Sequence, residues 1–229
     1  MERRQFLSYM GIAAIGSVLG IAAAPLRSGK KLLRPPGEIG EDKFLSACIK
    51  CGLCVQICPV NAIHLADITE GLSAGTAFID PRHGACDFSC VGIQCVLVCP
   101  SGALVHERAQ NAEKVRIGLA ELRPDLCLLV NNRLYSGPEH HNYNPSDYKW
   151  KVNPDSYRKE VCQLCADKCP IGPGAIDIEE KKDIKTGKTY QSPVVKAGCT
   201  GCGVCEMVCP VEPAAIVIIP EKRWNAKNV

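Results

Sequence analysis

The sequence is poor in large aromatic side chains: its 229 residues include only 4 Phe, 6 Tyr and 2 Trp, or 5% of the chain. Aromatic side chains bury the largest apolar areas in ordinary protein cores. A chain of this length can form one large domain or two small ones, but this one lacks the aromatic anchors of a conventional core. Another kind of interaction must hold the fold together.

Motifs for binding a substrate or a nucleic acid are also missing. The sequence has no P-loop, no G-x-G-x-x-G and no H-E-x-x-H, the patterns that hold phosphates, dinucleotides and catalytic zinc. The formal net charge is only +3, and no basic stripe is interleaved with aromatic residues. We therefore expect no nucleic-acid binding and no catalytic residues.

Long apolar runs are absent as well. The run from Met10 to Ala24 is shorter than the roughly 20 residues that span a membrane. It follows Arg3-Arg4-Gln5-Phe6-Leu7 and ends in small residues, which indicates a secretory signal. The arginine pair before x-Phe-Leu resembles a twin-arginine signal, so we predict that residues 1–24 direct export to the periplasm. Because Pro25 is unfavourable for cleavage, a retained membrane tether is the alternative.

Cysteine, by contrast, is abundant, with 16 residues in the chain. Disulfides, zinc sites and iron–sulfur clusters are the chemistries that use so many cysteines. Structural zinc sites usually combine two separated cysteine pairs, and disulfides between cysteines two residues apart would close strained small rings. The spacing therefore favours iron–sulfur clusters, with zinc and a disulfide framework as alternatives.

Two cysteine runs have the regular spacing Cys-x2-Cys-x2-Cys-x3-Cys-Pro. Their members are Cys48, Cys51, Cys54 and Cys58 in the first run, and Cys199, Cys202, Cys205 and Cys209 in the fourth. In bacterial ferredoxins, three cysteines of such a run hold one [4Fe–4S] cluster and the fourth reaches a partner cluster. The three thiolates lie on a tight loop that Gly52, Gly201 and Gly203 allow to close.

The other two cysteine runs are irregular. Their members are Cys86, Cys90, Cys95 and Cys99 in the second run, and Cys162, Cys165 and Cys169 in the third. The one cysteine left over is Cys127, which we predict to be the remote fourth ligand of the third cluster; a buried structural thiol is the alternative. All sixteen cysteines then serve four [4Fe–4S] clusters, with a [3Fe–4S] cluster at the second run as a variant.

The four runs also define the domain organisation, because each ends in Cys-Pro followed by alanine and an aliphatic residue. This internal repeat sets the bounds of a four-cluster domain at residues 44–222. We predict a proline-rich linker at 25–43, an irregular surface insertion at 128–161 and a tail at 223–229. Two adjacent histidines in the insertion, His140 and His141, are expected to be solvated.

Short apolar segments lie between the cysteine runs. Those around Ile176 and Val194 flank the turn signal Lys185-Thr186-Gly187-Lys188 and predict a β-hairpin. Residues 111–122 fit either a short amphipathic helix or a loop with a strand. The expected fold class is α+β, with two ferredoxin-like di-cluster units built from small sheets and short helices.

The chain resembles the NapG/MauM ferredoxin-type proteins over nearly its whole length outside the insertion. The resemblance rests on the segments ERRQFL, RPPG, FLSACIKCGLCVQICP, CPSGAL, RIGLAEL and KAGCTGCGVCEMVCPVEPAAI. The third run of this family also begins with an upstream cysteine, which supports Cys127. Two features depart from the family: the long gap before Cys162 and the three residues between Cys86 and Cys90.

The resemblance implies a periplasmic protein that carries electrons through four [4Fe–4S] clusters in a quinol-oxidising route. Its implied partners are a membrane polyferredoxin of NapH type as donor, and a periplasmic c-type cytochrome or molybdenum reductase, such as nitrate reductase, as acceptor. One alternative is a beta electron-transfer subunit of a molybdopterin oxidoreductase. Another, of a different class, is a cluster enzyme or redox sensor with an open iron site.

The pairing of the four clusters remains open from the residues alone. The hairpin between the third and fourth runs favours pairing of sequence neighbours. The family resemblance instead favours a nested arrangement, in which the first run pairs with the fourth and the second with the third. We take the nested arrangement as the expectation.

Overall fold

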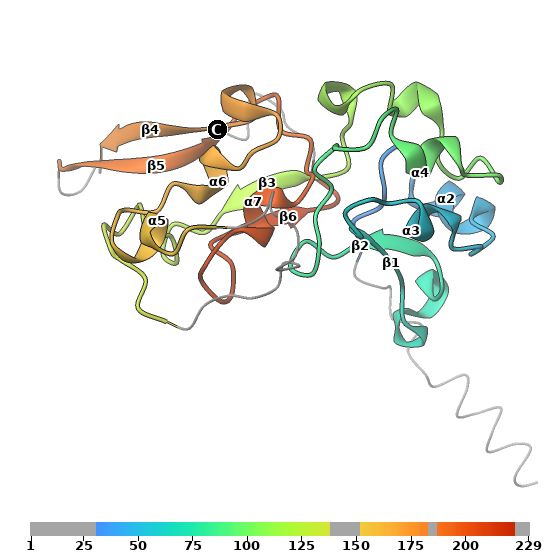
Figure 1. The fold of residues 1–229 in the computed structure, drawn as a ribbon, viewed down its shortest axis with the longest axis horizontal. Coiled ribbons are helices and arrows are strands. Elements are labelled where there is room, and N and C mark those ends of the chain that lie inside the picture. The colour runs from blue at the N-terminus through green and yellow to red at the C-terminus, as the bar shows by residue number, and fades with distance from the viewer. Residues whose placement is uncertain (1–30, 138–151, 183–186, 223–229) are drawn as a thin grey trace, which may run out of the picture.

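The computed structural model describes residues 31–137, 152–182 and 187–222. These residues form two halves that lie side by side (Figure 1). The helices and strands of the first half are α2 (Glu41–Ala47), α3 (Leu53–Gln56), β1 (Ile63–Leu65), η1 (Ile68–Ser73), β2 (Ala77–Ile79), α4 (Gln94–Leu97), η2 (His106–Arg108) and η3 (Ala112–Lys114). Those of the second half are β3 (Leu119–Leu122), α5 (Asp155–Arg158), α6 (Leu164–Asp167), η5 (Gly172–Gly174), β4 (Ile176–Lys182), β5 (Thr189–Val195), α7 (Val204–Met207) and β6 (Ile216–Ile219).

The described part of the chain contains three two-stranded antiparallel sheets, β1–β2, β3–β6 and β4–β5. The predicted hairpin is β4–β5, whose register begins at Ile176 opposite Val195. Residues 111–122 form a loop with a strand, since η3 and β3 occupy them. The small sheets and short helices match the expected α+β fold of tandem ferredoxin type.

Four helices of only four residues each carry the cysteine that comes just before the Cys-Pro cysteine of a run: Cys54 on α3, Cys95 on α4, Cys165 on α6 and Cys205 on α7. Helices of this length have no stability of their own in water. They form because the packing around the cysteine loops holds them. No helix of the described residues has the length and apolarity that a membrane crossing requires.

The hydrophobic core runs through both halves, from Leu33 to Ile218. Phe44 is its one fully buried aromatic ring, and many of its members are alanines and cysteines. The scarcity of aromatics predicted from composition is therefore a property of the core itself. The space that rings fill in other proteins is lined here by thiols.

The proline-rich stretch differs from the expected linker. Residues 33–37 are all buried, Leu33 bridges Ile79 of β2, and Glu38 bridges Leu104. Gly37 has φ +85°, and a Cβ there would lie 2.8 Å from the carbonyl oxygen of Val105. The prolines prevent regular secondary structure, but they do not prevent packing against the first half.

The insertion also differs from a purely surface excursion at its two ends. Tyr157 of α5 is only 6% exposed and packs with Leu128 and Leu164. Its carbonyl accepts a hydrogen bond from the N–H of Tyr135, and the two rings lie 5.8 Å apart. His140 and His141 lie outside the described residues, as do the signal segment and the tail.

Candidate iron–sulfur sites

Site 1 is a cavity in the first half that collects cysteines from two runs. Three of them, Cys48, Cys51 and Cys54, come from the first run, and Cys99 comes from the second. Aliphatic side chains, among them Leu65, line the rest of the cavity. Four thiols around one hollow provide the complete donor set of a [4Fe–4S] cluster.

Site 2 lies beside site 1 and has the reciprocal composition. Cys86, Cys90 and Cys95 of the second run line it together with Cys58 of the first. Burial, and after it the neighbouring charges of Cys90, Cys58 and Cys54, raise the pKa of Cys95 to about 12. The irregular spacing of the second run is accommodated by left-handed backbone at Phe88 (φ +56°) and Ile93 (φ +53°).

Site 4 occupies the second half and is built on the fourth run. Cys199, Cys202 and Cys205 line its cavity with Cys169 of the third run. The first three are all buried, and burial raises the pKa of Cys202 to about 12. The same two-run construction as in sites 1 and 2 is repeated here.

Site 3 brings the leftover cysteine to the third run. Burial raises the pKa of Cys165 well above its usual value, and the neighbouring charges of Cys162, Cys127 and Cys209 act in the same direction. Cys127 and Cys209 act on Cys162 as well, whose pKa is raised to about 12, chiefly by burial. Cys127 therefore lies with the third run, as predicted, although 34 residues separate it from Cys162.

The clusters pair with sequence neighbours, and the nested arrangement is wrong. The fourth cysteines of the first two runs exchange between sites 1 and 2, and those of the last two exchange between sites 3 and 4. Helix α3 contacts α4, and α6 contacts α7. Each pair of runs thus forms one di-cluster unit, because two successive runs fold against each other.

The cysteine loops close through left-handed backbone, as the glycines predicted. Gly201 (φ +75°) and Gly203 (φ +93°) provide it in the fourth run. In the first run Gly52 (φ +75°) matches Gly203, but a lysine, Lys50 (φ +58°), stands where the fourth run has Gly201. At Gly201 a Cβ would lie 2.4 Å from the backbone of Gly118, so that glycine is required by packing as well as by conformation.

The alanine that follows Cys-Pro in the first and fourth runs has a physical role at the sulfur. The N–H of Ala62 donates to Cys58 Sγ at 3.4 Å, and the N–H of Ala215 donates to Cys209 Sγ at 3.3 Å. Such donors stabilise a thiolate. Ala62 is fully buried and Ala215 is 4% exposed, so a larger side chain would find little room there.

Solvent access differs between the sites. Cys51 of site 1 is the one exposed cysteine among the sixteen, all of which are described and free of disulfides. At site 4, by contrast, three of the four cysteines are buried.

The two units meet where the N–H of Cys86 donates to the carbonyl of Cys202 at 3.1 Å. This contact places sites 2 and 4 next to each other.

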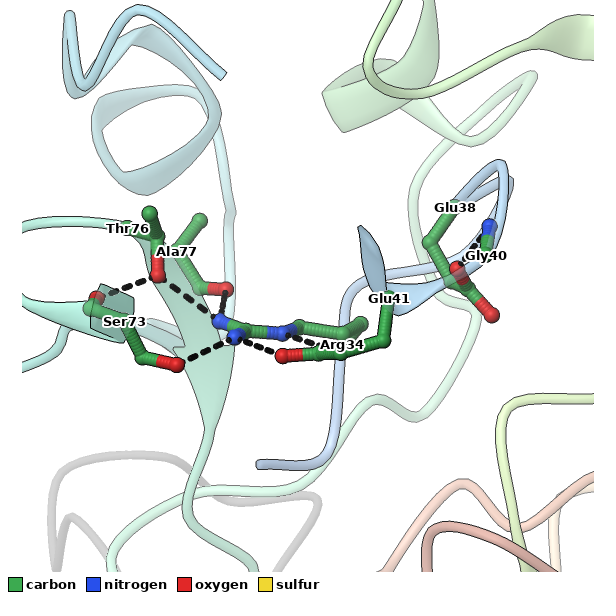
Figure 2. Close-up of polar contacts among 7 residues, drawn as sticks. All are labelled: Arg34, Glu38, Gly40, Glu41, Ser73, Thr76 and Ala77. Carbon is green, nitrogen blue, oxygen red and sulfur yellow. Dashed lines mark hydrogen bonds and ion pairs between the residues drawn. The ribbon is translucent and has the colours of Figure 1, made fainter. Parts of the chain in front are cut away.

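A buried arginine holds the segments that surround site 1 (Figure 2). The guanidinium of Arg34 donates to Glu41 of α2 at 2.9 Å through Nε, and to Thr76 Oγ1 and the carbonyl of Ala77, each at 2.9 Å. It also lies 4.9 Å from the centre of the Phe44 ring. Arg34 thus ties α2, which leads into Cys48, to the start of β2.

Residues 71–75 spell G-x-S-x-G, the spacing of a hydrolase nucleophile elbow. The structure gives Ser73 a different role. The serine is buried in η1 rather than at a strand-to-helix turn, and its Oγ accepts a hydrogen bond from Arg34 Nη2 at 3.1 Å. Ser73 is therefore part of the arginine network.

Two residues near the sites carried no signal in the sequence: Arg34 and Arg82. Both belong to the first half and are bonded to residues distant in sequence; Arg82, for example, reaches the carbonyl of Cys209. Arg34 is buried and Arg82 is partly buried. Buried arginine is unusual unless it is paired, but nothing in a single sequence distinguishes such an arginine from an exposed one.

The fold and the four cysteine groups define an iron–sulfur protein of the ferredoxin type. A family model of the 4Fe-4S binding domain matches residues 43–64, and one of the 4Fe-4S dicluster domain matches residues 160–212. The second match contains the third and fourth runs, in agreement with the pairing of sites 3 and 4. The chain therefore binds [4Fe–4S] clusters and transfers electrons; zinc and disulfides are not its organising chemistry.

Comparison with known proteins identifies the family within this class. The chain is 36% identical to the ferredoxin-type protein NapG of Escherichia coli, over 95% of this chain and 85% of the relative. It is 35% identical to the methylamine utilization ferredoxin-type protein MauM of Methylorubrum extorquens, over 84% and 74%. Identity to NapG of Haemophilus influenzae is 33%, over 96% and 72%. The chain belongs to the NapG/MauM family of ferredoxin-type proteins, as the sequence motifs predicted.

Proposed function

We propose that this protein relays single electrons through four [4Fe–4S] clusters between a membrane quinol-oxidising partner and a periplasmic reductase. The observation that carries the proposal is the division of all sixteen cysteines into four groups of four. The ligands are Cys48, Cys51, Cys54 and Cys99 at site 1; Cys86, Cys90, Cys95 and Cys58 at site 2; Cys127, Cys162, Cys165 and Cys209 at site 3; and Cys199, Cys202, Cys205 and Cys169 at site 4.

The contacts between sites support a linear order of 1, 2, 4 and 3. Sites 1 and 2 exchange ligands, as do sites 3 and 4. The bond from Cys86 to Cys202 joins sites 2 and 4. A bound cluster supplies one-electron chemistry at each site, and the chain's role is to hold the sites at fixed positions. Electrons then enter and leave at sites 1 and 3, the two ends of this order.

Family membership supports the proposed partners. A polyferredoxin of NapH type is the proposed donor, and a periplasmic c-type cytochrome or a molybdenum reductase of the nitrate reductase kind is the proposed acceptor. The complete thiol set at each site disfavours an enzyme or sensor with open iron. A permanently bound beta subunit of a molybdopterin oxidoreductase would copurify with its catalytic chain.

Iron and acid-labile sulfide per chain test the proposal directly. Anaerobically purified protein should contain about 16 of each, with a broad absorption band near about 400 nm. The variant Cys127→Ser should fall to about 12 of each as site 3 is lost, while Leu129→Ala, at a buried neighbour without a ligand role, should keep the full content. A wild-type protein with little sulfide would overturn the proposal.

Export by the twin-arginine route is part of the same proposal. This route carries folded proteins, which suits clusters that are inserted before export. Replacing both Arg3 and Arg4 with lysine should leave the protein in the cytoplasm with its iron intact. Cell fractionation with an iron assay measures this, and unchanged periplasmic protein would contradict it.

A further inference from the structure

Arg82 joins the two di-cluster units through a partly buried guanidinium. It lies in the turn after β2, in the first half, and its side chain is only 14% exposed. Its Nη1 donates to the carbonyls of Glu206 at 2.7 Å and Cys209 at 2.9 Å, and its Nη2 donates to the carbonyl of Val211 at 3.3 Å. One arginine of the first half therefore holds the C-terminal end of α7 and the chain that follows.

The backbone turn fixes the position of Arg82. Asp80 Oδ1 accepts the N–H of Arg82 at 3.1 Å, and the Asp80 carbonyl accepts those of His83 and Gly84. The guanidinium also bonds Glu212 Oε2 at 2.6 Å, whose side chain is 67% exposed. Because the carboxylate faces solvent, it neutralises the arginine only in part. Part of the positive charge of Arg82 is therefore left uncompensated by Glu212.

Cys209 is a ligand of site 3, the end of the electron route under the proposed function. Arg82 Nη1 donates to the carbonyl of this same residue at 2.9 Å, so a fixed positive charge lies beside the backbone that carries the Cys209 sulfur. Arg82 thus favours negative charge at this sulfur. Adding one electron to a cluster makes the site one unit more negative, so a fixed positive charge nearby favours the reduced form.

We propose that Arg82 is a positioning residue that raises the reduction potential of site 3 from across the boundary between the two units. The inference rests on the proposed electron-transfer function. It makes the last site of the order 1, 2, 4, 3 a more favourable electron acceptor than its four thiolates alone would be. The direction of flow along the chain is then biased toward site 3.

Redox titration of the holoprotein, followed by electron paramagnetic resonance, tests this inference. Arg82→Gln should make one of the transitions harder to reduce by about tenfold in the equilibrium constant, or about 59 mV for one electron. The shifted transition must be the one that disappears in Cys162→Ala. Arg82→Lys, which keeps the charge, should stay close to wild type, and so should Arg108→Gln, at an exposed arginine bonded to the carbonyl of Glu38.

The variant Glu212→Gln should shift the reduction potential of site 3 in the opposite direction to Arg82→Gln. It removes the carboxylate that partly neutralises Arg82, so the same transition should become easier to reduce. A merely structural role would not shift the potential in opposite directions in the two variants. Unshifted transitions in both would overturn the inference while leaving the proposed function intact. Wild-type protein without cluster signals would overturn the proposed function itself.

Discussion

At the scale of the residue, four cysteines that precede proline act outside their own run. Cys58 belongs to the first run but lines site 2, so Cys58→Ser should abolish the same resonance signal as Cys90→Ser and leave that of site 1 in place. The reason is that the fourth thiolate crosses to the partner cluster. Loss of the signal that Cys202→Ser removes would instead support the nested pairing and contradict the structure.

Two glycines with the same backbone conformation differ in their surroundings. In Gly52→Ala the added Cβ clashes with nothing, because no atom lies within 4 Å of it. The substitution therefore costs only the strain of the left-handed backbone, about 1–2 kcal/mol. Gly201→Ala has the same φ but would place its Cβ 2.4 Å from the backbone of Gly118, just before β3. We expect it to destabilise the holoprotein at least twice as much in denaturant titration. Equal losses would show that this close approach relaxes freely.

At the scale of the element, Arg34 connects α2 to the start of β2 through its side-chain hydrogen bonds. Arg34→Met leaves the carboxylate of Glu41, which is only 24% exposed, without its partner. Removing one member of a fully buried pair costs about 3–5 kcal/mol, and because Glu41 keeps some contact with water we expect a loss at or below the lower end of that range. Arg108→Met, at an exposed arginine, should change the free energy of unfolding by less than about 0.5 kcal/mol.

The double variant Arg34→Met with Glu41→Leu separates the cost of the lone charge from that of lost packing. If the unpaired carboxylate dominates, the double variant should be more stable than Arg34→Met alone when both are unfolded in denaturant. A further loss would mean that the contacts of Arg34 with Thr76, Ala77 and Phe44 carry most of the effect.

Local patterns predicted some elements, and non-local contacts decided the others. The β4–β5 hairpin was predictable because its apolar segments flank a turn signal. The buried stretch at 33–37 was not, because proline excludes helix and sheet without excluding burial. The ends of the insertion pack through Tyr135 and Tyr157, a contact between residues 22 positions apart. Such a contact leaves no periodic trace in the sequence.

For the candidate sites, too, local patterns predicted one part and non-local packing determined the other. Spacing predicted which cysteines form each loop, and the count of sixteen, together with the family resemblance, predicted that Cys127 joins the third run. Spacing did not predict which partner receives the fourth cysteine, because sequential and nested crossings use the same residues at the same spacings. That choice depends on which helices pack together: α3 with α4, and α6 with α7.

At the scale of the whole molecule, buried and partly buried thiols take the places that apolar rings would have in a conventional core. Without iron the thiols of Cys95, Cys162 and Cys202 are protonated at neutral pH, since burial raises the pKa of each to about 12. A protonated thiol does not bind cluster iron, so without iron no cluster links the four cysteines of a site. Iron binding and folding are therefore coupled, and the protein without iron should be largely unfolded.

The order in which iron is removed should follow the exposure of the sites. Under mild oxidation with excess chelator, site 1 should empty first because Cys51 is exposed, and site 4 last because Cys199, Cys202 and Cys205 are buried. The first four irons should leave with little change in circular dichroism, and loss of the last four should coincide with unfolding. Iron release and circular dichroism followed in one time course measure both. In Cys48→Ser, which lacks site 1, the fast phase should be missing while the slow one persists. A single concerted phase in the wild-type protein, or a fast phase that survives in Cys48→Ser, would contradict this order and show that the sites empty together through global opening of the fold.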